Sequence, residues 1–314
     1  MDVVTFGESM VVFSPDSSGP LRYIHSFNKS IGGAESNLSI ALSRLGNSVG
    51  WFSKVGDDEF GRYIISTIRG EGVDTSKAIV DGGYPTGLLF KEKFIHENPN
   101  VYYYRKGSAA SSITPEDLDK DYIASAKILH ITGITPAISN SAKETVLKAI
   151  DIARENNVLV SFDPNIRLKL WSIEEARPVL LEIASKADII FPGADEAKLL
   201  IGTEEPEEVA REFIKRGAIY VAVKLGAKGC FVADKNSSEF VPGYKVKPID
   251  TVGAGDGFAA GFLTGFLKGK SLKDCGMYGN GVGALATLVK GDCEGFPSFD
   301  QLLEFMGEKT IVSR

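Results

Sequence analysis

The stretch at residues 248–262, PIDTVGAGDGFAAGF, decides what this chain can be. Three small residues, Gly253, Ala254 and Gly255, run directly into the carboxylate of Asp256, and a segment rich in alanine, glycine and phenylalanine follows. This pattern is typical of a tight loop that opens a helix. Amides at a helix N-terminus lack intrahelical acceptors and carry roughly half a positive charge. Because the side chains are small, an anion can approach these amides closely.

The carboxylate of Asp256 is itself an anion, and it would repel a phosphate that was merely held in the loop. Its position is explained if it takes a proton from a nucleophile that attacks the phosphate, while the loop stabilises the transferring group. A plain N-cap aspartate between glycines is the alternative, and this stretch alone leaves both open. GDGFAA at 255–260 fits a loose dinucleotide fingerprint, but no βαβ unit follows it. GFLKGKS at 265–271 has one residue too few between its glycines for a P-loop.

Along the whole chain, short β-branched runs alternate with helical patterns. AKILHITG at 126–133 reads as a strand and SAKETVLKAIDIAREN at 141–156 as a helix, for example. The alternation predicts a doubly wound, mainly parallel central sheet flanked by helices, in a single α/β domain over 1–314. Two segments, 10–33 and 84–111, are strand-like without helices, and we expect them to form a small β-sheet lid. An edge extension of the main sheet is the alternative.

Around the glycine loop, KVKPID at 245–250 is predicted to be a strand, and GFAAGFLTGFLKG at 257–269 a helix. A second glycine pair precedes a helix predicted at 34–46. There Gly33 would let backbone come close to a ligand, and Asn37 offers both a donor and an acceptor. A helix N-terminus with a local cap is the plainer interpretation.

The composition limits the classes of partner. Hydrophobic residues make up 43% and charged residues 24%, with a net charge of −6, and the pI is about 5.3. An acidic chain does not suit nucleic acid or an anionic membrane, so we expect neither as a partner. No window is apolar over the ~18 residues of a membrane span, and no leader pattern begins the chain, so we expect it in the cytoplasm. The three scattered cysteines favour neither a disulfide framework nor a zinc site, and the three histidines, His25, His96 and His130, are interpreted as structural or surface residues.

A family resemblance rests on three motifs. DTVGAGDGFAAGFL at 250–263 resembles the C-terminal signature of the ribokinase-like, or PfkB, carbohydrate kinases. GGAESN at 32–37, with Gly46 and Gly56, resembles their N-terminal signature, and KLGAKG at 224–229 resembles their nucleotide-binding turn. The order and spacing of these segments fit the family over essentially the whole chain.

The chain departs from the family pattern at two positions. Glu35 stands where most of the family has proline. In GADE at 193–196, Gly193 replaces the usual asparagine, so that only Glu196 of the pair near the metal and phosphates is present. The glycine at position 193 weakens the contact with a metal ion that the resemblance would imply, and it leaves the predicted fold unchanged.

The resemblance implies that the γ-phosphoryl group of ATP is transferred to a sugar hydroxyl. Asp256 would be the general base, and the loop Gly253, Ala254 and Gly255 the anion hole. Mg²⁺ would be held mainly by phosphates and water, with Glu196 as the candidate protein contact, through water. The nucleotide would be held by Asn165, Lys224, Gly226, Gly229, Gly253, Gly255 and Asn280.

VYYYRKG at 101–107 bears on which sugar is bound. Alternate strand residues share a face, so Tyr103 and Arg105 would lie together. A guanidinium offers a bidentate fork to a carboxylate, and Arg167 follows the strand end FDPN, where open α/β sheets bind ligands. Two arginines favour an acidic sugar; two solvated surface arginines are the alternative.

Within the family, GGAESN, YYYR and FDPNIR together resemble the kinases of 2-keto-3-deoxygluconate, which phosphorylate its terminal 6-hydroxyl. A kinase of a neutral sugar such as fructose, and a sugar-binding regulator without catalysis, are the alternatives. An exposed lid also suggests a homo-oligomer built through it. By this resemblance the sugar acid would be contacted by Gly33, Asn37, Tyr103, Arg105 and Arg167.

Overall fold

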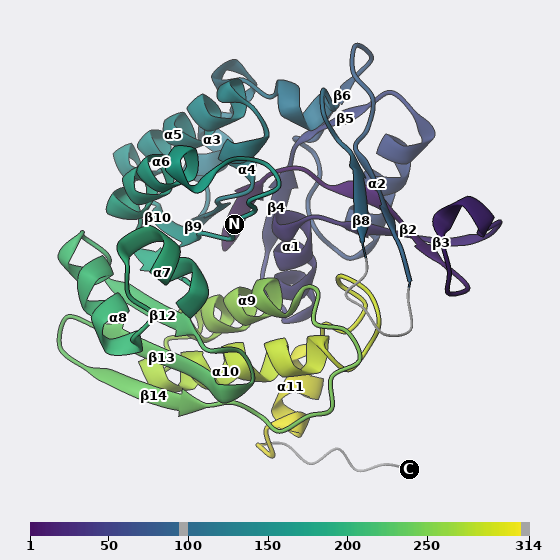
Figure 1. The fold of residues 1–314 in the computed structure, drawn as a ribbon. Coiled ribbons are helices and arrows are strands. Elements are labelled where there is room, and N and C mark those ends of the chain that lie inside the picture. The colour runs from purple at the N-terminus through teal and green to yellow at the C-terminus, as the bar shows by residue number, and fades with distance from the viewer. Residues whose placement is uncertain (94–99, 309–314) are drawn as a thin grey trace.

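The computed structural model describes residues 1–93 and 100–308 (Figure 1). Its centre is an eight-stranded sheet of order β14-β13-β12-β11-β10-β9-β1-β4. The strands from β4 to β12 pair in parallel, whereas β12–β13 and β13–β14 are antiparallel. The prediction of a doubly wound, mainly parallel sheet is therefore confirmed. The bounds are β1 Val3–Phe6, β4 Val49–Phe52, β9 Ile128–Thr132, β10 Leu159–Asp163, β11 Ile189–Ile190, β12 Tyr220–Lys224, β13 Gly229–Asp234 and β14 Ser238–Pro242.

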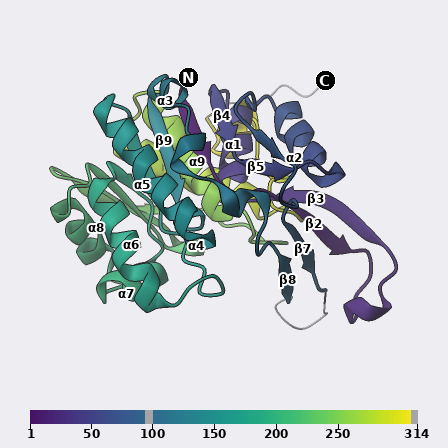
Figure 2. The same ribbon diagram turned by 90° about the horizontal axis from the view of Figure 1, so that it is seen from above.

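Helices cover both faces of this sheet (Figures 1 and 2). Neighbouring strand residues point to opposite faces, so Val3 joins one apolar core and Val4 the other. The core around Val4 is covered by α3 Lys120–Ala124, α4 Thr135–Ile138, α5 Asn140–Glu155, α6 Ile173–Lys186, α7 Ala194–Ile201 and α8 Pro206–Lys215. The core around Val3 is covered by α1 Ala34–Arg44, α2 Glu59–Gly70, α9 Ala254–Leu267, α10 Leu272–Ala286 and α11 Phe299–Phe305.

A smaller four-stranded sheet of order β3-β2-β7-β8 stands beside the main sheet (Figure 2). Its strands come from the two segments that were predicted to form a lid, and they pair with each other instead of extending the main sheet. Closure of this sheet over a ligand stays a prediction, and residues 94–99 of the second segment, with His96, lie outside the described residues. The bounds are β2 Met10–Pro15, β3 Phe27–Gly32, β7 Leu88–Lys91 and β8 Val101–Tyr104.

Short elements complete the chain. Strands β5 Lys54–Gly56 and β6 Ile79–Asp81 pair with each other. Within residues 1–93 and 100–308, no helix has the length and apolar character needed to cross a membrane. His25 is exposed, whereas His130 is buried beside Ser161 and burial lowers its pKa to about 3. The 3₁₀ turns are η1 Leu21–Tyr23, η2 Ala109–Ser112, η3 Pro115–Asp117 and η4 Gly226–Lys228.

One predicted strand is wrong. Residues 243–250 contain no strand; the amides of Ile249 and Asp250 instead donate to the carbonyl oxygen of Thr287, at 2.7 and 3.2 Å. Pro248 has no amide to give to a sheet ladder, and the alternating lysines of this segment are exposed. The glycine loop is therefore held by a neighbouring loop and not by a strand.

Candidate active site

The glycine loop forms the N-terminus of α9. Gly253 is the N-cap and has a left-handed φ of 78°, a conformation that favours glycine. A Cβ at this position would also collide with the carbonyl oxygen of Asp292. The first bond inside the helix runs from the amide of Gly257 to the carbonyl of Gly253 at 2.8 Å. The amides of Gly255 and Asp256 therefore have no acceptor within α9.

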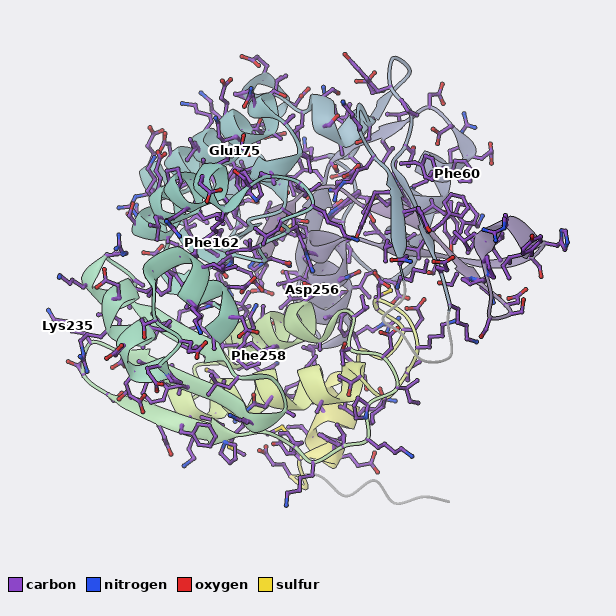
Figure 3. The ribbon with its side chains drawn as sticks, in the orientation of Figure 1. Phe60, Phe162, Glu175, Lys235, Asp256 and Phe258 are labelled. Carbon is purple, nitrogen blue, oxygen red and sulfur yellow. The ribbon has the colours of Figure 1, made fainter. Side chains whose placement is uncertain are left out.

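Asp256 lies in the first turn of α9, at the centre of the molecule (Figure 3). Its Oδ2 accepts a hydrogen bond from Nδ2 of Asn37 at 2.8 Å. This contact joins α1 to α9, two helices that lie far apart in the sequence. The side chain is partly buried. Burial, with the nearby carboxylate of Asp163, raises the pKa of Asp256 to about 7, against the opposite influence of Asn37, Arg167 and Lys224.

A buried ion pair lies beside this carboxylate. Lys224 ends β12, and its Nζ donates to Oδ2 of Asp163, at the end of β10, over 2.6 Å. The same Nζ lies 3.7 Å from the place where a Cβ of Gly255 would stand, so it borders the glycine loop. Burial disfavours the charged ammonium, but the carboxylates of Asp163 and Glu196 outweigh it and raise the pKa of Lys224. The ammonium is therefore charged at neutral pH.

Glu196 caps the start of α7 and fixes the loop after β10. Its Oε2 accepts from the amide of Gly193 at 2.7 Å, and its Oε1 accepts from the amide of Ile166 at 2.8 Å. Asn165 has a positive φ of 37°, and its amide donates to Oδ1 of Asp163 at 3.2 Å. Across the described residues, no group of three or more acidic, histidine or cysteine side chains could hold a metal ion. A divalent cation would therefore fit here only with phosphate and water as its main ligands.

The predicted nucleotide residues of the turn after β12 have clear structural roles. Gly226 and Gly229 have φ values of 59° and 113°, and a Cβ on Gly229 would collide with the carbonyl oxygen of Val241. Nδ2 of Asn280 donates to the carbonyl oxygens of Val241 and Pro242, at 3.0 and 3.2 Å. This contact holds the end of β14 against α10. Their contact with a nucleotide stays a prediction.

Of the predicted sugar residues, Asn37 and Arg167 adjoin Asp256, whereas Tyr103 and Arg105 lie together at the small sheet. Gly33 caps α1, and a Cβ there would collide with the carbonyl oxygen of Glu8. Arg167 is exposed and lies close enough to Asp256 to lower its pKa. Tyr103, from the small sheet, is 44% exposed. The Arg105 guanidinium carbon lies 5.9 Å from the centre of the Tyr103 ring.

Three groups in this region were not predicted as site residues. Glu8 forms an ion pair with Arg105. Asp163 pairs with Lys224, and the strand end FDPN could have indicated it, because it follows a buried strand in an open α/β sheet. Asp292 pairs with Lys91 of β7 at 2.5 Å, and no local pattern pointed to this contact.

Glu35, the residue that departs from the family pattern, is fully buried. Its Oε1 accepts from the hydroxyls of Thr132 and Thr135 at 2.6 and 2.7 Å. Its Oε2 has no hydrogen-bond partner among the described residues. Burial raises the pKa of this carboxyl. Glu35 therefore ties the start of α1, and with it Asn37, to the loop after β9.

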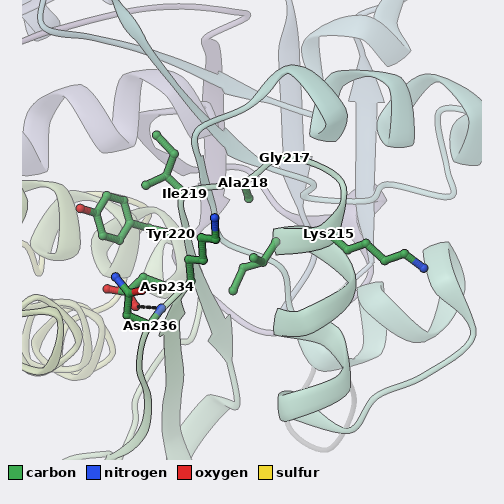
Figure 4. A pocket seen from close by; sticks show the side chains of 9 residues that line it. Lys215, Gly217, Ala218, Ile219, Tyr220, Asp234 and Asn236 are labelled. Carbon is green, nitrogen blue, oxygen red and sulfur yellow. Dashed lines mark hydrogen bonds between the residues drawn. The ribbon is translucent and has the colours of Figure 1, made fainter.

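A surface depression of about 550 Å³ lies elsewhere (Figure 4). It is lined by residues 214–215, 217–220 and 234–236, at the amino end of β12. Lys224 ends the same strand, so the depression lies at the opposite edge of the sheet from Asp256. Its carboxylate, Asp234, already accepts from the amides of Asn236 and Ser237. We assign it no role.

A doubly wound α/β sheet with a helix-terminal glycine loop, an adjacent aspartate and a lysine that borders the loop is the arrangement expected of a phosphotransferase. The chain belongs to the pfkB family of carbohydrate kinases, whose sequence profile matches residues 1–298.

Among curated relatives, the 2-dehydro-3-deoxygluconokinase of Bacillus subtilis (strain 168) is 42% identical, over 99% of this chain and 97% of the relative. Fructokinase-1 of Zea mays is 33% identical, over 97% of both chains. A putative ribokinase II from E. coli, solved in complex with ATP and Mg²⁺, has a TM-score of 0.91 at 28% identity, covering 98% of this chain and 99% of that chain. The predicted family, and with it a sugar kinase activity, is confirmed.

Proposed function

We propose that this protein transfers the γ-phosphoryl group of ATP to the 6-hydroxyl of 2-keto-3-deoxygluconate, the sugar acid also called 2-dehydro-3-deoxygluconate. The observation that carries the proposal is the position of Asp256. Its carboxylate stands in the first turn of α9, beside amides free to bind an anion, with a pKa raised to about 7. A base with a pKa near the working pH combines a useful deprotonated fraction with useful proton affinity.

In the proposed reaction, Asn37 holds Oδ2 of Asp256 and leaves Oδ1 to accept the proton of the sugar hydroxyl. The hydroxyl oxygen forms its bond to the γ-phosphorus as the bond from that phosphorus to the β,γ-bridging oxygen breaks. ADP leaves with the electron pair, and the proton stays on Asp256. The amides of Gly255 and Asp256 stabilise the charge on the transferring group.

Lys224 is well placed to act on the phosphates, because its ammonium borders the glycine loop. Mg²⁺ would supply charge neutralisation at the phosphates. Glu196 would face its water shell, since both of its carboxylate oxygens already accept backbone amides. The E. coli relative, which was solved with ATP and Mg²⁺, supports the choice of these two ligands.

The sugar acid is supported by Arg167 near Asp256, by Arg105 beside Tyr103 and by the Bacillus subtilis relative. Arg105 follows β8 and lies beside Tyr103 of the small sheet, and Arg167 lies on the loop after β10. A neutral sugar is the second candidate, because the guanidinium of Arg105 already has a carboxylate partner in Glu8 and because a fructokinase is also a relative.

A coupled ADP-release assay over a panel of sugars and sugar acids tests the proposal. The informative pair is 2-keto-3-deoxygluconate and 3-deoxy-D-fructose, which carries a hydroxymethyl group in place of the carboxylate. We expect the acid to have the higher kcat/KM, and R105A and R167A to reduce kcat/KM for the acid far more than for the neutral analogue. A preference of the wild-type protein for the neutral sugar would refute the acid.

The face of the small sheet that carries Phe90 and Tyr104 supports a homo-oligomer in which two copies contact each other through this sheet. A depression of about 510 Å³ on that face is lined in part by Phe27, Phe90 and Tyr104, and Tyr104 is 66% exposed. An exposed aromatic surface of this kind suits a second copy. Light scattering should give a dimer or larger assembly for the wild-type protein and a smaller mass for Tyr104→Asp. A monomeric wild-type protein would refute the assembly.

A further inference from the structure

Glu8 is a buried carboxylate between β1 and β2 that the proposed chemistry does not use directly. Its side chain is 1% exposed, and both of its oxygens have partners. Oε1 accepts from the hydroxyl of Ser108 at 2.6 Å. Oε2 accepts from Nε of Arg105 at 2.6 Å, and Nη2 of the same guanidinium also contacts it.

The surroundings of Glu8 place it where the small sheet meets the main body. A Cβ on Gly87, just before β7, would stand 2.5 Å from its Oε1, and a Cβ on Gly33, at the start of α1, would collide with its carbonyl oxygen. Arg105 and Ser108 follow β8. Glu8 therefore borders the N-terminus of α1 through its backbone, and its carboxylate joins the main body to two ends of the small sheet.

The geometry of the guanidinium shows what this contact leaves free. A guanidinium has a side edge, made by Nε and Nη2, and an end that carries Nη1, and each can meet a carboxylate. Glu8 occupies the side edge of Arg105. The end with Nη1 remains, on a side chain that is 11% exposed and lies beside the Tyr103 ring.

The charges lead to the same role. An arginine as buried as Arg105 would be costly without a counter-charge, and Glu8 supplies it. Arg167 is exposed, and its side chain has no hydrogen bond or ion pair among the described residues. Arg105 would therefore mainly orient the carboxylate of the sugar acid. Arg167 would mainly attract it, because its positive charge has no ion-pair partner.

We propose that Glu8 is a positioning residue for substrate specificity: it holds the side edge of Arg105 so that the remaining end faces the carboxylate of the sugar acid. The inference rests on the proposed function, since it needs an acidic substrate. Glu8 acts through Arg105 and does not contact the sugar.

The test compares E8A, E8Q, R105A and the double variant E8A/R105A in the ADP-release assay. In E8Q the amide oxygen accepts from Arg105 and the amide nitrogen donates to Ser108, so orientation is kept while the charge is lost. We expect E8A to raise KM for 2-keto-3-deoxygluconate about tenfold or more, the scale of one charged hydrogen bond. KM for ATP should change less than about twofold, and E8Q should restore KM for the acid to within about threefold of the wild type.

The double variant separates this inference from the proposed function. If Glu8 acts through Arg105, E8A/R105A has the same KM for the acid as R105A alone. Multiplying effects, or an E8A variant with unchanged KM, would overturn the role of Glu8. A normal KM for the acid in R105A would instead refute the proposed carboxylate contact itself.

Two further variants keep the test usable if E8A does not fold. S108A removes the second anchor of Glu8 and should raise KM for the acid about two- to fivefold, with no change for ATP; a normal KM for the acid would count against the positioning role. Glu212→Ala is the matched control, because it breaks a Glu–Arg pair at 2.7 Å on α8, away from the site. It should leave both KM values at the wild-type level, and a raised KM would show that loss of any such pair has this effect.

Discussion

The ionisation of Asp256 gives a prediction whose size follows from the structure. Burial first, and the neighbouring Asp163 second, raise its pKa from 3.8 to about 7. A base must be deprotonated to act, and at pH 5 a group with a pKa of 7 is ionised in about one molecule in a hundred. We therefore expect kcat/KM to fall about a hundredfold from its plateau to pH 5, tenfold for each pH unit.

The measurement is kcat/KM for the sugar over pH 5–9 at saturating ATP and Mg²⁺. An aspartate with an ordinary pKa would lose less than about a tenth of its ionised form at pH 5, so a profile that stays flat to pH 5 would refute the raised pKa. D256N should lose about 10²–10⁴ in turnover and should show no inflection near pH 7. Near-normal turnover in D256N would remove Asp256 from the role of base.

The same carboxylate makes a matching prediction for stability. Because the pKa is higher in the folded chain, the group favours folding fully below pH ~4 and loses that contribution as the pH rises through 7. At ~1.4 kcal/mol per pKa unit, the loss reaches at most about 4 kcal/mol, and less to the extent that water reaches the side chain. The free energy of unfolding of D256N, relative to wild type, should therefore increase from pH 4 to pH 8 in urea titrations. A constant difference would contradict it.

The remaining predictions concern the loop and its cations. G253A should cost more stability and more kcat than G269A, because both residues have a positive φ but only the first has no room for a Cβ; thermal melts and kinetics measure this, and equal losses would contradict the steric argument. Lys224→Met should lower the free energy of unfolding by about 3 kcal/mol, since its buried carboxylate partner is left unpaired; an unchanged urea midpoint would refute it. KM for the sugar acid should lose much of its salt dependence in R167A but keep it in R105A. The reason is that, of these two arginines, only Arg167 lacks an ion-pair partner among the described residues. Equal salt dependence of KM in the two variants would refute these different roles of Arg167 and Arg105.

Much of the fold could be predicted because parallel strands have a strong local signal. The strands β9 and β10 are buried on both faces and alternate with amphipathic helices, which fixes the layer architecture. The antiparallel pair β13 and β14 was not predicted, because a hairpin after β12 interrupts that alternation. The strand predicted at 245–250 failed because alternation of lysine with apolar residues does not show whether a partner strand exists.

In the site, too, the contacts that are local in sequence could be predicted and the distant ones could not. The glycine loop and Asp256 are close in sequence, so their joint position at a helix terminus could be predicted. Arg105 was correctly expected to lie beside Tyr103, since the contact depends on local strand geometry. Its pairing with Glu8 spans 97 residues. Nothing near a glutamate after the first strand indicates which cation will face it, so the sequence predicted for Arg105 a sugar carboxylate or a solvated surface position, and not Glu8.

A kinase site needs positive charge for phosphates and carboxylates, but the same charge would lower the pKa of its base. With Asp256 as the proposed base, this protein resolves the conflict by giving the neighbouring Lys224 its own buried carboxylate. The ammonium of Lys224 donates to Asp163, so part of its field is cancelled where it would act on Asp256. The pKa of Asp256 stays near neutrality although a helix N-terminus, Arg167 and Lys224 lie beside it. Three such pairs adjoin the site or the small sheet beside it: Lys224–Asp163, Arg105–Glu8 and Lys91–Asp292. In the part of the chain that the structure describes, Arg167 has no such partner, so the attraction for the proposed anionic substrate is concentrated on the loop after β10, next to Asp256, the proposed base.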